Sequence, residues 1–227
     1  MTEHLEQFLE ATDYFDYNHP AVQALLDRFL DGSESDDIAV AIKLYNGVRD
    51  SYHYNPYQFS IDPNQFKASY CAEAEESYCI PKAVLFGALC RAKGIPARLG
   101  LADVKNHISS PRLTRLLQSD VFVMHGYTDV YLNGKWIKAT PAFDSSLCQK
   151  IGIHALEFDG AEDSVFQEFN LDGNKHMEYL KDHGTFADVP AMQIYQAVGE
   201  AYPHLRKAYQ DGKLSEFDSL ENDLPVS

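Results

Sequence analysis

The sequence predicts an α+β fold, in which a cysteine-bearing helix packs on an antiparallel sheet and extra helices come first. Apolar residues recur at helical spacing through the N-terminal quarter of the chain. The segment Ser77–Arg98 is rich in apolar residues and has helix start and stop signals at its ends. Asn133-Gly134 then separates two strand-like segments, and this dipeptide is the strongest short-range signal for a β-hairpin.

The N-terminal helices are predicted from their apolar spacing and their capping residues. Met1–Phe15 has apolar residues on one helical face. His19-Pro20 opens a second helix that Gly32 closes, because Pro is favoured in the first turn and Gly beyond the last. Ser35 is placed to cap a third helix, whose apolar stripe reaches Tyr52. We interpret these helices as scaffold.

The segment Ser77–Arg98 is predicted to be a helix with a cysteine in its first turn. Ser77 can cap its start, while Gly94 and Pro96 end it. Cys79 therefore lies where backbone N–H groups and the positive end of the helix dipole favour a thiolate. This is the setting of a cysteine nucleophile, although a free cysteine is also commonly a buried structural residue.

The middle of the chain is predicted to form strands. We expect strands at Arg98–Val104, Val121–Leu132 and Lys135–Pro141, with a short helix around Leu113–Leu117. A two-residue loop at Asn133-Gly134 fixes the hairpin register. This register pairs Leu132 with Lys135, Tyr131 with Trp136, Asp129 with Lys138, Tyr127 with Thr140 and His125 with Ala142.

His125 is the histidine best placed to act as a base, because it lies on a rigid strand with polar neighbours on its own face. In the predicted register its diagonal neighbours are Thr140 and Asp144, at a spacing of about 7–8 Å. Pro141 interrupts the ladder, which weakens the Asp144 placement. The alternative interpretation of His125 is a half-buried strand histidine without a catalytic role.

The remainder of the chain is predicted to be less regular. Asp144–Pro190 has short strands only at Leu156–Phe158 and His176–Leu180, and Ala191–Gln210 forms a helix interrupted near Pro203. An acidic tail follows from Asp211, with a frayed end at Pro225–Ser227. We expect a single domain over 1–227, with a core at about 36–145, an N-terminal helical elaboration at 1–35 and a C-terminal extension at 146–227.

Composition limits the classes of partner. The chain has 19 basic and 34 acidic residues and a net charge of −15, which argues against nucleic acid and anionic membranes. No segment is apolar enough to span a membrane. The 4 cysteines form no C-x-x-C pair, which favours reduced thiols in a cytoplasmic protein. We expect no cofactor and no metal, since His176 and His183 lack a third suitably spaced ligand.

Two stretches together resemble a known family. The first is Cys79-x-x-x-Ala83 followed by Leu89-Cys90-Arg91-Ala92-Lys93-Gly94-Ile95-Pro96-Ala97-Arg98. The second is His125-Gly126-Tyr127-Thr128-Asp129-Val130-Tyr131-Leu132 with Gly134-Lys135-Trp136. Over roughly Val48 to Asp144 the chain resembles the transglutaminase-like superfamily, most specifically in the Gly-Ile-Pro-Ala-Arg end of the helix.

The resemblance implies a papain-like transglutaminase core with a Cys-His-Asp triad, in which Cys79 is the nucleophile and His125 the base. Relatives usually carry Asp-Pro after the tryptophan, whereas this chain has Thr140-Pro141. Asp144 is therefore the expected third member, with Thr140 as the alternative. The implied function is acyl transfer or amide and peptide hydrolysis through a thioester, on a peptide, protein or small amide substrate. The alternative is a catalytically inactive transglutaminase-like binding or scaffold module, and the oligomeric state is left open.

Overall fold

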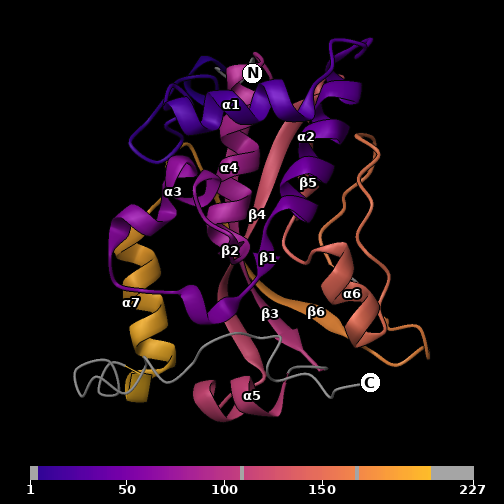
Figure 1. Cartoon of the computed structure of the whole chain (residues 1–227). Helices are drawn as coiled ribbons and strands as arrows, with labels where there is room; N and C mark the ends of the chain where they lie inside the picture. The colour runs from indigo at the N-terminus through magenta and orange to yellow at the C-terminus, as the bar shows by residue number, and fades with distance from the viewer. Residues whose placement is uncertain (1–4, 108–109, 167–168, 206–227) are drawn as a thin grey trace.

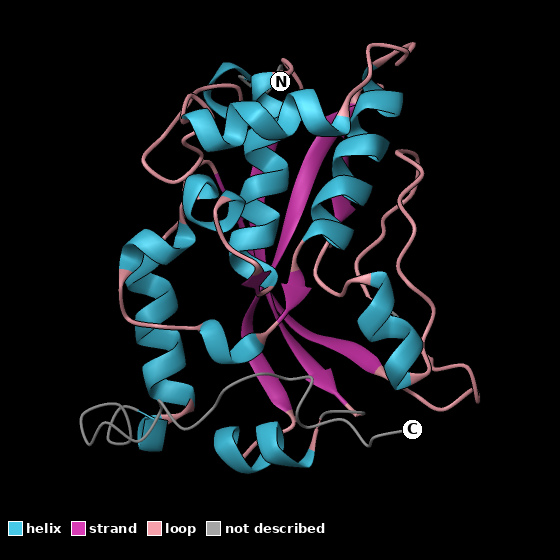
Figure 2. Ribbon diagram, viewed as in Figure 1, coloured by secondary structure: helices cyan, strands magenta, loops and turns pink. Residues whose placement is uncertain are grey.

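A four-stranded antiparallel sheet with helices packed on it forms the body of the protein (Figures 1 and 2). The structure is a computed structural model that describes residues 5–107, 110–166 and 169–205. The strand order is β5-β4-β3-β6, and a separate short parallel pair joins β1 to β2. The predicted α+β class, with a cysteine-bearing helix on an antiparallel sheet, is confirmed.

The described helices are α1 (Pro20–Phe29), α2 (Asp37–Ser51), α3 (Ala68–Ala72), α4 (Cys79–Ala92), α5 (Pro111–Leu117), α6 (Ser145–Ile151) and α7 (Ala191–Ala201), with short 3-10 turns at Leu5–Phe8, Pro56–Gln58 and Pro63–Phe66. The described strands are β1 (His53–Tyr54), β2 (Glu76–Ser77), β3 (Ala97–Asn106), β4 (Val121–Leu132), β5 (Lys135–Ala139) and β6 (Met177–Phe186).

Helix α4 is the centre of the fold. It packs against β4, α2 and α3, and Figure 1 shows it between these two helices and in front of the sheet. Every residue from Cys79 to Arg91 is buried, and apart from Lys82 and Arg91 the larger side chains of the helix are apolar. Its N-cap is Tyr78, so the prediction of a Ser77 cap is wrong, because Ser77 belongs to β2. Gly94 follows the helix with φ +78°, as predicted.

Two buried cations tie α4 to its surroundings. Lys82 Nζ donates to the carbonyl oxygens of Arg49 and Tyr52, both at 2.8 Å, and so satisfies the end of α2. Arg91 donates to the carbonyl oxygens of Glu10, Ala97 and Ala187. Distant parts of the chain thus meet on one helix.

The hairpin register is confirmed from Leu132–Lys135 to Asp129–Lys138, and one further pair, Thr128–Ala139, extends the ladder. The ladder then stops, so the predicted pairs Tyr127–Thr140 and His125–Ala142 are wrong. The Thr140 N–H donates instead to the Ser164 carbonyl oxygen at 2.9 Å, and Pro141 has no N–H to offer. Strand β5 therefore ends at Ala139 rather than at Pro141.

The predicted starts of α1 and α2 agree with the structure to within one residue, whereas the predicted end of α1 and the first helix do not agree. His19 caps α1 with Pro20 in the first turn, as predicted, and Asp36 rather than Ser35 caps α2. Gly32 takes a left-handed φ of +78°, although α1 has already ended at Phe29. The helix predicted over Met1–Phe15 is only the 3-10 turn Leu5–Phe8 within the described part of that segment.

The C-terminal third is more regular than the sequence indicates. Helix α6 was missed, and the strand predicted at His176–Leu180 is part of the longer β6, which pairs with β3. Leu156–Phe158 is not a strand. Helix α7 ends at Ala201, before Pro203. The predictions for residues 206–210, the acidic tail and the frayed end lie outside the described residues.

Candidate active site

Cys79 is the first residue of α4, and its side chain lies inside the protein rather than on its surface. Only 9% of the residue is exposed. Burial raises the pKa of the Cys79 thiol to about 11, although backbone hydrogen bonds from Gly126, Ile80 and Cys79 itself act to lower it. The sulfur is therefore a neutral thiol at pH 7. The sequence pointed to a thiolate because helix position is local, whereas the burial comes from distant elements.

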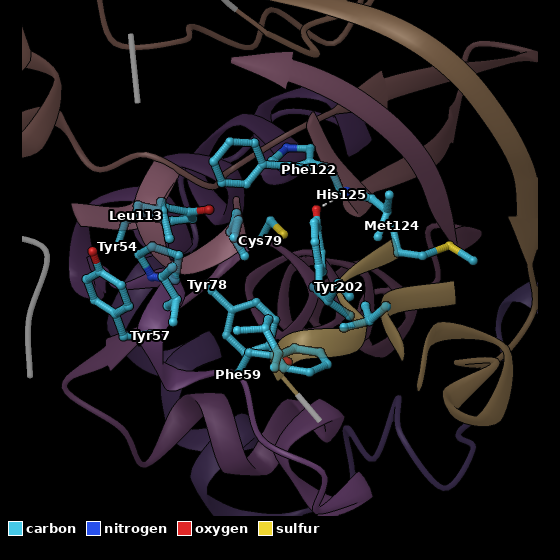
Figure 3. Close-up of a pocket in the computed structure, with 17 residues that line it drawn as sticks. Tyr54, Tyr57, Phe59, Tyr78, Cys79, Leu113, Phe122, Met124, His125 and Tyr202 are labelled. Atoms are coloured by element: carbon cyan, nitrogen blue, oxygen red, sulfur yellow. Dashed lines mark hydrogen bonds between the residues drawn. The ribbon is translucent and has the colours of Figure 1, made fainter. Parts of the chain in front are cut away.

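His125 lies on β4 and lines the same pocket as Cys79 (Figure 3). It is 6% exposed, and burial lowers the pKa of its imidazole to about 4. A neutral imidazole at pH 7 can accept a proton from a thiol or return one to a leaving group. The structure thus brings together the predicted nucleophile and the predicted base, both uncharged.

Close backbone contact between β4 and α4 holds these two residues in one pocket. A Cβ on Gly126 would lie 2.9 Å from Ile80 Cα and 3.2 Å from Ile80 N, so only glycine fits there. Two residues further along β4, Thr128 Oγ1 donates to the Ala83 carbonyl oxygen at 2.7 Å. The glycine beside His125 is a sequence signal of this close approach.

A β-bulge in β4 directs the chain immediately before His125. Ala102 of β3 pairs with His125 while Val104 pairs with Phe122, so β4 carries one extra residue between these pairs. Met124 takes a left-handed φ of +58° there, an unusual conformation for a residue with a side chain. Bulges of this kind re-aim the neighbouring side chain, which here is His125.

Side chains from two other elements stabilise the bulge. The Met124 N–H donates to Asp103 Oδ1 at 3.0 Å, and the same oxygen lies 2.7 Å from His183 Nε2 on β6. On the other side, the Tyr202 hydroxyl donates to the Val121 carbonyl and accepts from the Val123 N–H. Sequence reasoning missed these positions because they depend on contacts between distant segments.

Removing Asp103 should loosen the bulge without removing a side chain from the pocket lining. Asp103→Ala leaves the Met124 N–H without its acceptor, and we expect acylation of Cys79 to slow by roughly tenfold as His125 loses its fixed direction. The rate is measured with an activated ester. Asp182→Ala, on the neighbouring strand, is the matched control and should retain the full rate. Equal rates in the two variants would show that Asp103 does not position His125.

The structure places neither predicted third member in a hydrogen bond with His125. Asp144 caps α6: its carboxylate accepts from the N–H groups of Leu147 and Tyr54, at 3.0 Å each, and from Ser146 Oγ. Although burial opposes ionisation, these three hydrogen bonds lower the pKa of Asp144 below its ordinary value. The histidine beside this carboxylate is His53, whose Nδ1 lies 3.9 Å from Asp144 Oδ1.

The alternative third member, Thr140, is also not in contact with the imidazole through a hydrogen bond. Its Oγ1 is buried and has no hydrogen-bond partner among the described residues. Its backbone pairs with Ser164 instead of continuing the ladder toward His125. The sequence could not reveal this, because the competing partner lies beyond the hairpin.

Burial of His125 has a measurable consequence for stability. The unfolded chain takes up a proton on this residue near pH 6.5, whereas the folded protein does so only near pH 4. Since the unfolded state binds more protons in this window, the free energy of unfolding falls as the pH falls from 6.5 to 4, by up to about 3 kcal/mol. His125→Gln should remove this part of the pH dependence in urea unfolding.

His176 provides the comparison for this measurement. Burial likewise lowers its pKa to about 4, with a smaller contribution from His107, so His176→Gln should remove a similar part of the pH dependence. Because each variant keeps the other histidine, the two changes are separable. An unchanged pH dependence in His125→Gln would contradict the burial of a neutral imidazole at this site.

Seventeen of the described residues line the pocket, and most of them are apolar (Figure 3). Beyond Cys79 and His125, they come from the loop before and after Pro56, from the start of α4, from α5, from the bulge and from the region of α7. The residues from α5 are Leu113, Leu116 and Leu117, and those from the α7 region are Val198, Tyr202 and Leu205. The helical spacing within each group is visible in the sequence, but the sequence does not reveal that the two groups line the same pocket.

The described ranges show neither a metal site nor a membrane span. No three His, Cys, Asp or Glu side chains in these ranges are grouped so as to hold a metal ion. None of the helices described is both long and apolar enough to cross a membrane. All 4 cysteines are free and buried.

A central cysteine helix lies on an antiparallel sheet, and a histidine lies on the adjoining strand β4. The family model of the transglutaminase-like superfamily matches residues 23–141, just over half of the chain. The chain belongs to the transglutaminase-like superfamily.

One similar solved structure is a "putative cysteine protease" from Cytophaga hutchinsonii. It is 19% identical, with a TM-score of 0.41, and the match covers 82% of this chain and 56% of that one. This chain thus spans little more than half the length of that protein. No curated protein shows a significant match.

Proposed function

We propose that this protein carries out cysteine-dependent acyl transfer, or amide or peptide hydrolysis, through a thioester on Cys79. The observation that carries the proposal is the shared pocket of the Cys79 thiol and the His125 imidazole, between elements in direct backbone contact. Membership of the transglutaminase-like superfamily supports the same chemistry.

The proposed reaction has two steps. Cys79 Sγ attacks the carbonyl carbon while its proton passes to His125, and His125 then gives that proton to the departing amine, leaving a thioester. Water or a second amine attacks the thioester, gives its proton to His125, and releases Cys79 as the thiol. The Cys79 N–H at the start of α4 is the natural donor to the developing oxyanion.

The protonation states decide when the thiol is activated. Burial raises the pKa of the Cys79 thiol to about 11 and lowers that of the His125 imidazole to about 4, so moving the proton from one to the other in the resting protein is unfavourable. No thiolate–imidazolium pair is therefore stored in the resting protein. The proton moves as the bond to the carbonyl carbon forms, so the reaction depends on a bound carbonyl group.

A second candidate function is a catalytically inactive binding or scaffold module. The observation that favours it is the bonding of Asp144, whose carboxylate is engaged by the cap of α6 and by Tyr54. An imidazole without an acidic partner is oriented and stabilised less well as it takes up a proton. Asp144 and Thr140 remain proposals as the third member of the site.

An acylation burst distinguishes the two functions. With p-nitrophenyl acetate in excess, the wild-type protein should release about one equivalent of p-nitrophenolate rapidly and gain one acetyl group by intact mass. Cys79→Ala should lose the burst, and His125→Gln should slow it by roughly 100-fold or more. Cys90→Ala, which changes another buried cysteine of α4, should keep it. No burst above that of Cys79→Ala would leave only the binding module.

A further inference from the structure

The pocket beside Cys79 has a chemical character that the proposed function does not itself require. Its lining includes no acidic, amide, lysine or arginine side chain among the described residues, although the whole chain carries a net charge of −15. The polar groups in the lining are those of Cys79, His125 and four tyrosines. A lining whose described residues include no acidic, lysine or arginine side chain indicates that the pocket selects for uncharged groups.

The hydroxyl groups of Tyr78 and Tyr202 are engaged by the protein and do not make the pocket hydrophilic. Tyr78 donates its hydroxyl to Gln65 Oε1 at 2.7 Å, and the Tyr202 hydroxyl bonds the backbone of the bulge. Burial raises the pKa of both phenols, so neither supplies a negative charge near pH 7. What Tyr78 and Tyr202 offer a ligand is mainly ring surface.

Two helices present their apolar faces to the pocket. Leu113, Leu116 and Leu117 form one face of α5, at the spacing i, i+3 and i+4. Val198 and Tyr202 do the same from α7 and its C-terminal end. These faces enclose the space around the thiol instead of filling it.

The volume sets the size of the occupant. The pocket is partly open and has a volume of about 140 Å³, close to the roughly 150 Å³ of an apolar cavity that holds benzene. A phenyl ring or a chain of about four to six carbons fits such a space. A charged group would lose its hydration there and find no partner in the described lining, which is costly.

We propose that the acyl half of the substrate carries an uncharged apolar group of this size, bound between α5, α7 and the bulge with its carbonyl carbon at Cys79. This inference rests on the proposed function and specifies its substrate class. The group is either a short acyl chain or the side chain of an apolar amino acid, which present the same chemistry to the pocket.

The test compares p-nitrophenyl esters that share one leaving group. Acylation rates are measured for acetate, butyrate, hexanoate and 6-aminohexanoate esters, each divided by its rate with glutathione. The rate should rise about 4-fold for each methylene that the pocket buries, so butyrate should exceed acetate by roughly 15-fold. The 6-aminohexanoate should react far more slowly than hexanoate. Equal rates for the two six-carbon esters would overturn the proposal.

A second pair of esters identifies the source of the apolar group. N-acetylphenylalanine and N-acetylglycine p-nitrophenyl esters differ by one aromatic side chain. A larger gain from glycine to phenylalanine than from acetate to hexanoate indicates an amino-acid side chain. The reverse indicates an acyl chain. No gain in either series would overturn the proposal.

A matched pair of variants assigns the effect to this pocket. Val198→Asp places a carboxylate in the lining and should shift the preference from hexanoate toward 6-aminohexanoate. Met192→Asp changes an apolar residue of the same helix that is 79% exposed, and it should leave the preference unchanged. The same preference in Val198→Asp and the wild type would contradict the assignment.

Binding without chemistry separates this proposal from the proposed function. If no ester acylates the protein, the catalytic proposal fails, and Cys79→Ala is then titrated with hexanamide and 6-aminohexanamide by NMR. Selective binding of hexanamide, with shifts confined to the pocket, supports the apolar site on its own. Equal binding of both amides, or of neither, would overturn it.

Discussion

Replacing Gly126 with alanine is expected to reduce acylation of Cys79 by 100-fold or more. The added Cβ would lie 2.9 Å from the Ile80 Cα, and neither backbone can yield cheaply. Strand β4 must therefore shift away from α4, and with it His125. A displacement of about 1 Å at a reacting pair costs on the order of 100-fold in rate. We also expect the free energy of unfolding to fall by about 1–3 kcal/mol.

Gly199→Ala is the matched control for this change. Gly199 lies in α7, and a Cβ there meets nothing within 4 Å. Alanine favours a helix over glycine, so this variant should keep its acylation rate and its stability. The burst rate and urea unfolding are measured for both variants. A Gly126→Ala protein with the wild-type rate would show that close contact of β4 and α4 does not set the geometry of the site.

Removing the Arg91 guanidinium is expected to destabilise the protein by about 3–5 kcal/mol, because each hydrogen bond from a charged donor contributes about 1.5 kcal/mol or more. Arg91 is 2% exposed and donates to the carbonyl oxygens of Glu10, Ala97 and Ala187 at 2.6 to 2.9 Å. Its guanidinium also lies 3.7 Å from the centroid of the Phe15 ring. Burial lowers the pKa of Arg91 to about 10, so it remains protonated at pH 7. Arg91→Leu leaves three carbonyl acceptors without this donor, and one of them belongs to the buried residue Ala97.

Two further variants test this account by urea or thermal unfolding. Arg91→Lys keeps the charge but has a single nitrogen, which cannot reproduce the three directions of donation, so we expect only partial recovery. Arg28→Leu removes an exposed arginine whose guanidinium lies over the Phe29 ring at 5.6 Å, and it should cost less than about 1 kcal/mol. Similar losses in Arg91→Leu and Arg28→Leu would contradict the role of the buried network.

The parts of the fold that depend on local signals could be predicted from the sequence. The bounds predicted for β4 match the structure, and the hairpin register follows from Asn133-Gly134 as far as Thr128. The cysteine helix is present because Gly94 and Pro96 end it and its apolar residues bury it. These features depend on residues that are close in the sequence, so they can be predicted from the sequence.

The third member of the site depends on contacts that the sequence does not display. Asp144 looks like a triad candidate when the hairpin ladder is extended past Pro141. Ser164 competes for the backbone of Thr140 and ends the ladder. Asp144 is followed by Ser-Ser-Leu, which is also the pattern of a helix N-cap, and α6 takes it up in that role. The sequence around Asp144 is thus compatible with a triad member and with a helix N-cap. The pairing of Thr140 with Ser164 favours the N-cap.

The Gly-Ile-Pro-Ala-Arg motif, which carried the family resemblance most specifically, is structural rather than chemical in this protein. Gly94 provides the left-handed residue after α4. Arg98 pairs with Asp129 at 2.9 Å, and its guanidinium lies 3.8 Å from the centroid of the Trp136 ring. The motif therefore joins the end of the helix to three strands. The motif is specific to the family because one short segment must make all of these contacts.

The packing around Gly87 involves a residue that lies outside the stretch shared with the family. A Cβ on Gly87 would lie 2.6 Å from the Phe15 ring, which is fully buried although it precedes the matched residues 23–141. Strand β6 follows that stretch and covers the edge of β3. A chain trimmed to 23–141 would expose a hollow beside α4 and an open sheet edge, which invites strand pairing between molecules. The stretch that matches the family model is therefore shorter than the stretch that packs together in this protein.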